Sequence, residues 1–107
     1  RGFVEVKGVT LEENGVVRFP DAPTLRGVKH LNGLLNAKKE GYEAAVCFVV
    51  QMEGVKYLEP NDDTHPEFGQ ALRRAAAAGV EVLAFACRVK PDAVVPAETV
   101  PVILGED

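Results

Sequence analysis

Long apolar segments are absent from this 107-residue sequence. No run approaches the roughly 20 residues that a transmembrane helix requires. The first residues also lack the basic and apolar segments of a secretory signal peptide. We therefore expect a cytoplasmic protein without membrane contact, folded as one domain around a single core.

An excess of basic residues is also missing. Lysine and arginine number 12 against 16 aspartates and glutamates, which gives a net charge of −4 and an isoelectric point near 5.2. A domain that holds DNA through bulk charge is normally basic. Any contact with nucleic acid must therefore be local, or be supplied by another segment of a longer protein.

Cysteine is scarce, and its two occurrences form no metal-binding pattern. Cys47 and Cys87 lie 40 positions apart within apolar runs, and neither has a neighbouring histidine or second cysteine. Buried free thiols in a reducing compartment are the expected state.

The first part of the chain predicts a β-hairpin followed by a helix. Residues 2–11 have the composition of a strand, Asn14-Gly15 is a turn signal, and residues 16–19 return as a second strand. Thr24 is placed to cap a helix that continues to about Glu40 and ends at Gly41. Its apolar stripe is predicted to contain Leu25, Val28, Leu31 and Leu35.

The rest of the chain predicts alternating strands and a helix. Residues 44–50 and 80–89 are continuously apolar runs, typical of strands buried on both faces. Between them we expect a short edge strand at 56–58 and a helix at 66–78. Asp62, Asp63 and Thr64 offer capping groups for this helix, and Pro66 suits its first turn. Its small apolar face is predicted to contain Phe68, Leu72, Ala75 and Ala76. A Pro-containing loop and a last short strand at 100–104 complete the chain. This order predicts an α/β sandwich with a mixed, largely parallel sheet flanked by two helices.

Charged residues on the first strand are the main candidates for chemistry. Alternation places Phe3, Glu5, Lys7 and Val9 on one face of the strand. A carboxylate and an ammonium between apolar residues suit a metal-dependent phosphodiesterase, in which the carboxylate holds a divalent cation and the ammonium orients water. The same spacing also occurs in ion pairs on exposed strands, and the pattern alone leaves both interpretations open.

Two further polar groups have a structural and a functional interpretation. The functional interpretation places the start of the first helix beside Glu5 and Lys7, where its free N–H groups favour a phosphate and its basic side chains are able to contact a nucleic-acid backbone. In the structural alternative, Thr24 is a helix cap and Asp21 is a turn residue, while Arg26, Lys29 and His30 form a solvated basic face.

A second polar cluster precedes the second helix and contains Asp62, Asp63, His65 and Glu67. It suggests either a metal site or helix capping, and capping is favoured. Arg73 and Arg74 are expected on a solvated face.

Three segments resemble the sugar fermentation stimulation protein (SfsA) family. Residues 4–11 match a Glu-Val-Lys-x-Val-Thr-Leu stretch, and residues 79–84 resemble a Gly-Val-Glu-Ile-Leu-Ala strand. Residues 19–31 match the signature Phe-Pro-Asp-Ala-x-Thr-x-Arg-Gly-x-Lys-His-Leu. The segments occur in the family's order and extend over almost the whole chain.

The resemblance implies a fold and a domain position. Family members join an N-terminal OB-like domain to a C-terminal domain with the restriction-endonuclease-like PD-(D/E)XK fold. Residues 1–107 would then be that single C-terminal domain, incomplete at its N-terminus. The OB-like domain and the strand that carries the motif's first aspartate would lie upstream of Arg1.

The resemblance also implies a function. It describes a DNA-binding protein, with RNA as another candidate partner, that is linked to regulation of sugar (maltose) metabolism. Glu5 and Lys7 would form the catalytic Glu-x-Lys half of a nuclease motif, with Mg²⁺ or Mn²⁺ as the cofactor. Glu5 and Asp21 are the candidate metal ligands, and Thr24, Arg26, Lys29 and His30 are the candidate nucleic-acid contacts. One carboxylate holds magnesium poorly, so cleavage is expected of the full-length protein rather than of this fragment alone.

Other functions remain open at the level of sequence. The domain would otherwise be a non-catalytic DNA-binding or regulatory module, or a small-molecule or protein-interaction domain with a structural Glu5–Lys7 pair. A homodimer formed through an exposed sheet edge is a further expectation. A monomeric mass by light scattering would contradict it.

Overall fold

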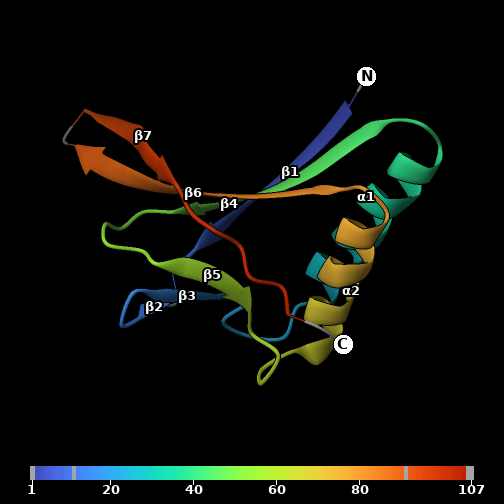
Figure 1. The fold of residues 1–107 in the computed structure, drawn as a ribbon, viewed down its shortest axis with the longest axis horizontal. Helices are drawn as coiled ribbons and strands as arrows, with labels where there is room; N and C mark the ends of the chain where they lie inside the picture. Colours follow the sequence, from blue (N-terminus) through green and yellow to red (C-terminus); the bar gives the residue numbers. More distant parts are fainter. Residues whose placement is uncertain (1, 11, 91, 106–107) are drawn as a thin grey trace.

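A computed structural model describes residues 2–10, 12–90 and 92–105 of the chain. The described elements and their bounds, drawn in Figure 1, are β1 (Gly2–Val9), β2 (Glu12–Glu13), β3 (Val16–Phe19), α1 (Leu25–Lys39), β4 (Glu43–Val50), β5 (Tyr57–Pro60), α2 (Pro66–Ala77), β6 (Glu81–Lys90) and β7 (Ala93–Thr99).

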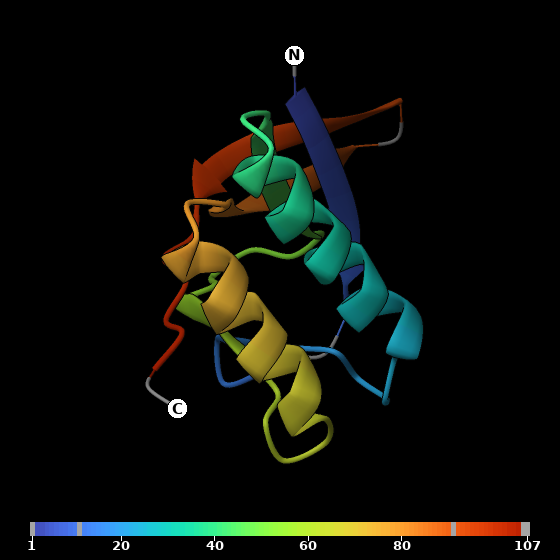
Figure 2. The same ribbon diagram turned by 90° about the vertical axis from the view of Figure 1, so that its right-hand side faces the viewer.

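The strands form two sheets. The larger sheet has the order β1-β4-β6-β7, with β1, β4 and β6 parallel and β7 antiparallel to β6. The smaller sheet has the order β2-β3-β5. Figures 1 and 2 show α1 and α2 side by side, both on one side of the larger sheet. The predicted α/β fold with a mixed sheet and two helices is confirmed.

The hairpin predicted between residues 2–11 and 16–19 is wrong. The turn forms at Asn14 and Gly15, whose φ angles of 54° and 85° suit an Asn-Gly pair, but it joins β3 to the two-residue β2. β1 instead pairs along its whole length with β4. The turn is a local signal, whereas β1 pairs with a strand about 40 positions away in the sequence, which a local pattern does not indicate. Leu11, part of the predicted strand, lies outside the described residues.

The C-terminal prediction is also wrong in part. A loop was expected after residue 89, and β7 is found there instead. The predicted last strand at 100–104 is reduced to one isolated bridge between Leu58 and Val102. A proline within β7 is compatible with a strand because β7 is at the edge of its sheet.

The helix boundaries follow the sequence closely. Thr24 caps α1, and its Oγ1 accepts a hydrogen bond of 2.9 Å from the N–H of Gly27. Gly41, just past the helix, has the positive φ of 93° that favours glycine. Within the predicted stripe, Leu31 is buried, but Leu25 is 84% exposed.

The start of α2 differs from the prediction. Its N-cap residue is His65, which makes no side-chain capping bond, so capping by Asp62, Asp63 or Thr64 is wrong. Pro66 occupies the first turn, as expected. Of the predicted apolar face, Phe68, Leu72 and Ala75 are buried in the core, whereas Ala76 is half-buried.

The core lies between the helices and one face of the larger sheet. Along β4 that face carries the buried residues Ala44, Val46, Phe48 and Val50. Among the residues that the structure describes, those of the opposite face given below are only half-buried or exposed, and neither helix covers this face (Figure 1). The members of this outer face are Val4, Val6, Ala45, Cys47, Val49, Leu83 and Phe85. The prediction that strand 44–50 is buried on both faces is therefore wrong for the chain described.

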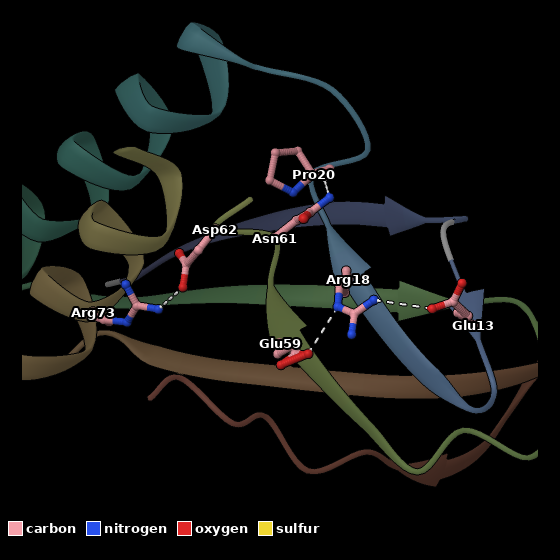
Figure 3. Close-up of polar contacts among 7 residues, drawn as sticks. All are labelled: Glu13, Arg18, Pro20, Glu59, Asn61, Asp62 and Arg73. Carbon is pink, nitrogen blue, oxygen red and sulfur yellow. Dashed lines mark hydrogen bonds and ion pairs between the residues drawn. The ribbon is translucent and has the colours of Figure 1, made fainter. Parts of the chain in front are cut away.

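Polar side chains join the strands of the smaller sheet and the segments that follow β3 and β5. Arg18 of β3 lies between Glu59 of β5, at 3.0 Å, and Glu13 of β2 (Figure 3). Asn61 is buried and donates a 2.9 Å hydrogen bond to the carbonyl of Pro20. These contacts fix the chain segment that leads from β3 into α1.

Arg73 and Arg74 do not share the solvated face that was expected. Arg73 is half-buried and pairs with Asp62 (Figure 3). It also donates a hydrogen bond to the carbonyl oxygen of Leu104. Arg74 is exposed. Arg73 therefore ties α2 to the segment before it and to the C-terminal segment.

Two glycines of α1 are expected to respond oppositely to alanine. A Cβ at Gly27 would lie 2.9 Å from the Thr24 side chain and 3.0 Å from the Phe68 ring, whereas a Cβ at Gly33 meets nothing within 4 Å. Gly33→Ala should stabilise the domain by about 0.5–1 kcal/mol. Gly27→Ala should destabilise it, because overpacking costs about 1–3 kcal/mol and outweighs that gain. Urea denaturation of both variants tests this, and equal shifts would contradict the close approach of Phe68.

Candidate functional site

The inner face of β1 carries the charged pair at the edge of the larger sheet. Glu5 is opposite the buried Val46 and Lys7 is opposite the buried Phe48, so both side chains leave β1 on the side where the helices pack. Figure 2 shows α1 running alongside β1. The edge strand and the helix thus enclose the two charges.

His30 of α1 completes a three-residue cluster with Glu5 and Lys7. The Lys7 Nζ is 3.3 Å from Glu5 Oε1 and 2.9 Å from His30 Nδ1, and that Nδ1 is 3.0 Å from the same Glu5 oxygen. The side chains of Lys7, His30 and Glu5 are 14%, 29% and 34% exposed. The cluster is thus partly desolvated but open to a ligand.

The cluster has two alternative proton arrangements. His30 Nδ1 either accepts a hydrogen bond from the Lys7 ammonium, or carries a proton and donates it to Glu5. One ring nitrogen cannot do both at once. Lys7 is able to donate to Glu5 in either state, so the carboxylate always has a donor. A proton can therefore move at His30 Nδ1 without leaving a charge of the cluster unpaired.

A groove of about 480 Å³ begins at this cluster and runs between β1 and α1. Glu5 and His30 line it at one end, and the aromatic residues Phe3 and Tyr42 also line it. Lys29 adds a positive charge to its wall. The groove places the cluster at the rim of a space large enough for a small organic group.

The other predicted site residues are at the start of α1. Thr24 is the helix cap, Arg26 is exposed, and Lys29 is exposed in the wall of the groove. Asp21, the second candidate ligand, is an exposed residue in the bend before α1. In the described part of the chain, no three histidine, cysteine, aspartate or glutamate side chains are grouped closely enough to share a metal ion.

The second polar cluster has a structural arrangement. His65 is buried, and its Nδ1 accepts a 3.2 Å hydrogen bond from the N–H of Thr24, which links the starts of the two helices. Asp62 pairs with Arg73. Glu67 lies in the first turn of α2, where a negative charge is favourable.

Both cysteines are free thiols. Cys87 is buried, whereas Cys47 is only half-buried, on the outer face of the sheet. Burial raises the pKa of the Cys47 thiol, and the neighbouring Cys87 raises it further. The thiol form of Cys47 is therefore favoured at neutral pH, which makes it a poor nucleophile.

Sequence reasoning identified Glu5, Lys7 and His30, and one of its interpretations placed the start of the first helix beside Glu5 and Lys7, but it did not give His30 as their direct partner. Their union depends on α1 crossing beside β1, which no local pattern encodes. Phe3 was recognised only as an apolar flank, and Tyr42 was missed. Both are exposed, at 45% and 39%, and their rings meet edge to face at 5.5 Å. An aromatic residue directly after the helix-ending Gly41 was the available signal for Tyr42.

The fold and the cluster define an α/β domain with a Glu–Lys–His group at the open edge of a mixed sheet. A family model described as the sugar fermentation stimulation protein RE domain matches residues 1–93. The chain therefore belongs to the SfsA family.

Curated relatives and a solved structure agree with this assignment. The chain is 55% identical over 102 residues to a sugar fermentation stimulation protein homolog of Clostridium beijerinckii, with 95% of this chain and 45% of that protein covered. It is 58% identical over 87 residues to a homolog of Caldanaerobacter subterraneus, with 81% and 38% covered. The structure of Pyrococcus furiosus SfsA in complex with Ca²⁺ matches with a TM-score of 0.86 and 26% identity, covering 94% of this chain and 44% of that one.

Two further facts bear on the whole protein. The chain spans less than half the length of these relatives. In the ranges that the structure describes, neither helix has the length and apolar character that crossing a bilayer requires.

Proposed function

We propose that this domain supplies part of a metal-dependent phosphodiesterase site that acts on nucleic acid, within a restriction-endonuclease-like domain. The observation that carries the proposal is the meeting of Glu5, Lys7 and His30 within hydrogen-bonding distance at the rim of a groove. A cytoplasmic location and a link to sugar (maltose) metabolism belong to the same proposal.

Each residue of the cluster has a distinct role in this proposal. Lys7 is the least exposed member, and its ammonium would bind a phosphate oxygen and stabilise the negative charge that develops there. His30 would hold or transfer a proton at Nδ1, between Lys7 and Glu5. Arg26 and Lys29, both exposed on α1, would contact the phosphate backbone on either side.

Glu5 is the residue that would hold the divalent ion. Its carboxylate is partly exposed at the groove, and Mg²⁺ is commonly bound by one or two carboxylates together with waters and substrate phosphates. When bound, the ion stabilises charge on the phosphate and makes water a stronger nucleophile. The Ca²⁺ complex of the Pyrococcus furiosus relative supports an oxygen-ligand site in this family. The relatives are about twice as long, and we propose that residues outside this chain complete the ligand set.

The proposal is tested by a cleavage and binding assay. The 107-residue chain and the full-length Clostridium beijerinckii relative would be incubated with DNA and RNA, single- and double-stranded, with Mg²⁺, Mn²⁺ or a chelator. We expect the full-length protein to cleave only with metal, and the chain to bind nucleic acid more tightly with metal than with chelator. Glu5→Gln, and the matching variant of the relative, control for copurifying nucleases.

Other results would favour the alternatives. Binding without cleavage by either protein, unchanged by chelator, would indicate a non-catalytic DNA-binding module, for which the single carboxylate and the net charge of −4 provide some basis. Absence of all binding would indicate a small-molecule or protein-interaction domain with a structural Glu5–Lys7 pair.

A further inference from the structure

Several residues that line the groove beside the Glu5–Lys7–His30 cluster have no role in the phosphodiesterase proposal. Its cluster end carries the charged groups, whereas Phe3 and Tyr42 present exposed rings next to them. Phe3 is two residues before Glu5 on the same face of β1, so the aromatic and acidic positions are about 7 Å apart along the strand. A sugar spans a comparable distance between a phosphate and its base.

The groove is open because α1 carries small residues where it faces β1. Gly33 and Ala37 lie one helical turn apart on this face, and both line the groove. A Cβ at Gly33 would meet no atom within 4 Å. A larger side chain at this position would enter empty space, so the absence of one leaves room for a ligand.

The lining suits a nucleobase. The exposed aromatic rings provide surfaces on which a base of any identity is able to stack. Asn36 and Glu40, which also line the groove, supply hydrogen-bonding groups for a base edge. Lys29 in the wall lies where it would attract the neighbouring phosphate.

We infer that this groove binds one unstacked base of a single-stranded nucleic acid while the adjacent phosphate lies at the Glu5–Lys7–His30 cluster. The inference rests on the proposed phosphodiesterase function and adds the substrate class. A base inside a duplex is paired and stacked and cannot enter the groove without being extruded. Single strands, or frayed ends, are therefore the preferred ligands.

The test uses a variant that fills the groove without harming the fold. Gly33→Leu puts a side chain into the open space, and leucine is a better helix former than glycine, so the melting temperature should stay the same or rise. A labelled oligothymidine of about ten nucleotides and its duplex with oligoadenine serve as probes, with binding measured by fluorescence anisotropy in Ca²⁺.

We expect the wild-type chain to bind the single strand about tenfold more tightly than the duplex. Gly33→Leu and Tyr42→Ala should each weaken single-strand binding by about tenfold and leave duplex binding nearly unchanged. Asn32→Leu is the matched control, because Asn32 is an exposed neighbour on α1 that does not line the groove. It should leave both affinities unchanged.

Failure of this inference is distinguishable from failure of the proposed function. In one outcome, Glu5→Gln abolishes metal-dependent cleavage by the full-length relative, but Gly33→Leu changes neither single-strand binding nor cleavage. The inference about the groove is then wrong, and the proposed phosphodiesterase function is supported. If single-strand binding depends on Gly33 and Tyr42 while Glu5 and metal have no effect on binding or cleavage, the base site stands and the phosphodiesterase is wrong. Equal binding of strand and duplex by the wild type would also overturn the inference.

Discussion

Replacing Lys7 by methionine is expected to lower metal-dependent cleavage by the full-length protein about 10²- to 10⁴-fold. The Lys7 ammonium is the most buried charge of the cluster and contacts both Glu5 and His30. Methionine has a similar length and no charge, and His30 Nδ1 remains available to donate to Glu5. The substitution therefore removes transition-state stabilisation with little effect on folding. The measurement is kcat and KM at saturating Mg²⁺.

Comparison with Glu5→Gln separates the roles of the two residues. Glu5→Gln should lower both the affinity for divalent metal, measured by calorimetry, and the rate of cleavage. Lys7→Met should lower kcat while the metal affinity stays within a few-fold of the wild type. Loss of metal binding in both variants would assign Lys7 a positioning role, through Glu5, rather than direct contact with the phosphate. An unchanged kcat in Lys7→Met would exclude the lysine from catalysis.

Phe68→Ala is expected to cost about 3–5 kcal/mol of the free energy of unfolding. Phe68 is fully buried on α2, its ring meets that of Phe19 at 5.2 Å, and it is in close contact with the Gly27 position of α1. Phe19 in turn contacts Phe48 of β4 at 5.4 Å. The three rings join the smaller sheet, the larger sheet and α2. Removal of the Phe68 ring leaves a cavity beside Phe19 and the Gly27 position, which the surrounding elements would have to fill.

Urea denaturation measures this effect. A domain of this size has a total stability of about 5–15 kcal/mol, so the midpoint should fall by about a fifth or more, with an unchanged slope. Leu25→Ala is the matched control, because Leu25 is 84% exposed and its loss should cost no more than about 0.5 kcal/mol. Similar midpoints for the two variants would show that the contacts among Phe68, Phe19 and Phe48 do not hold the elements together.

The sequence predicted the elements better than their partners. The cap at Thr24, the turn at Asn14-Gly15 and the helix end at Gly41 were found because each depends on neighbouring residues alone. The partner of β1 was predicted wrongly, since a hairpin is the nearest solution and pairing with β4, about 40 positions away, is not visible locally. β7 was missed because its proline suggested a loop.

The candidate site was predicted in pieces. Alternation correctly placed Glu5 and Lys7 on one face of a strand, and the family resemblance drew attention to His30. Nothing in the sequence indicated that His30 Nδ1 would lie within 3.0 Å of both charged groups. The groove was not predicted, because it depends on the separation of α1 from β1 and on an empty space above Gly33.

The sequence by itself determined the family, the order of the main strands and helices as far as β6, and the residues that carry charge on β1. These follow from hydrophobic periodicity, caps and turns, which act over a few residues. Only the tertiary structure decided which strands pair, which face of the sheet is covered, and that an acid, a lysine and a histidine from two elements share one site. Such contacts form between residues far apart in the chain, where burial of apolar surface outweighs local preference.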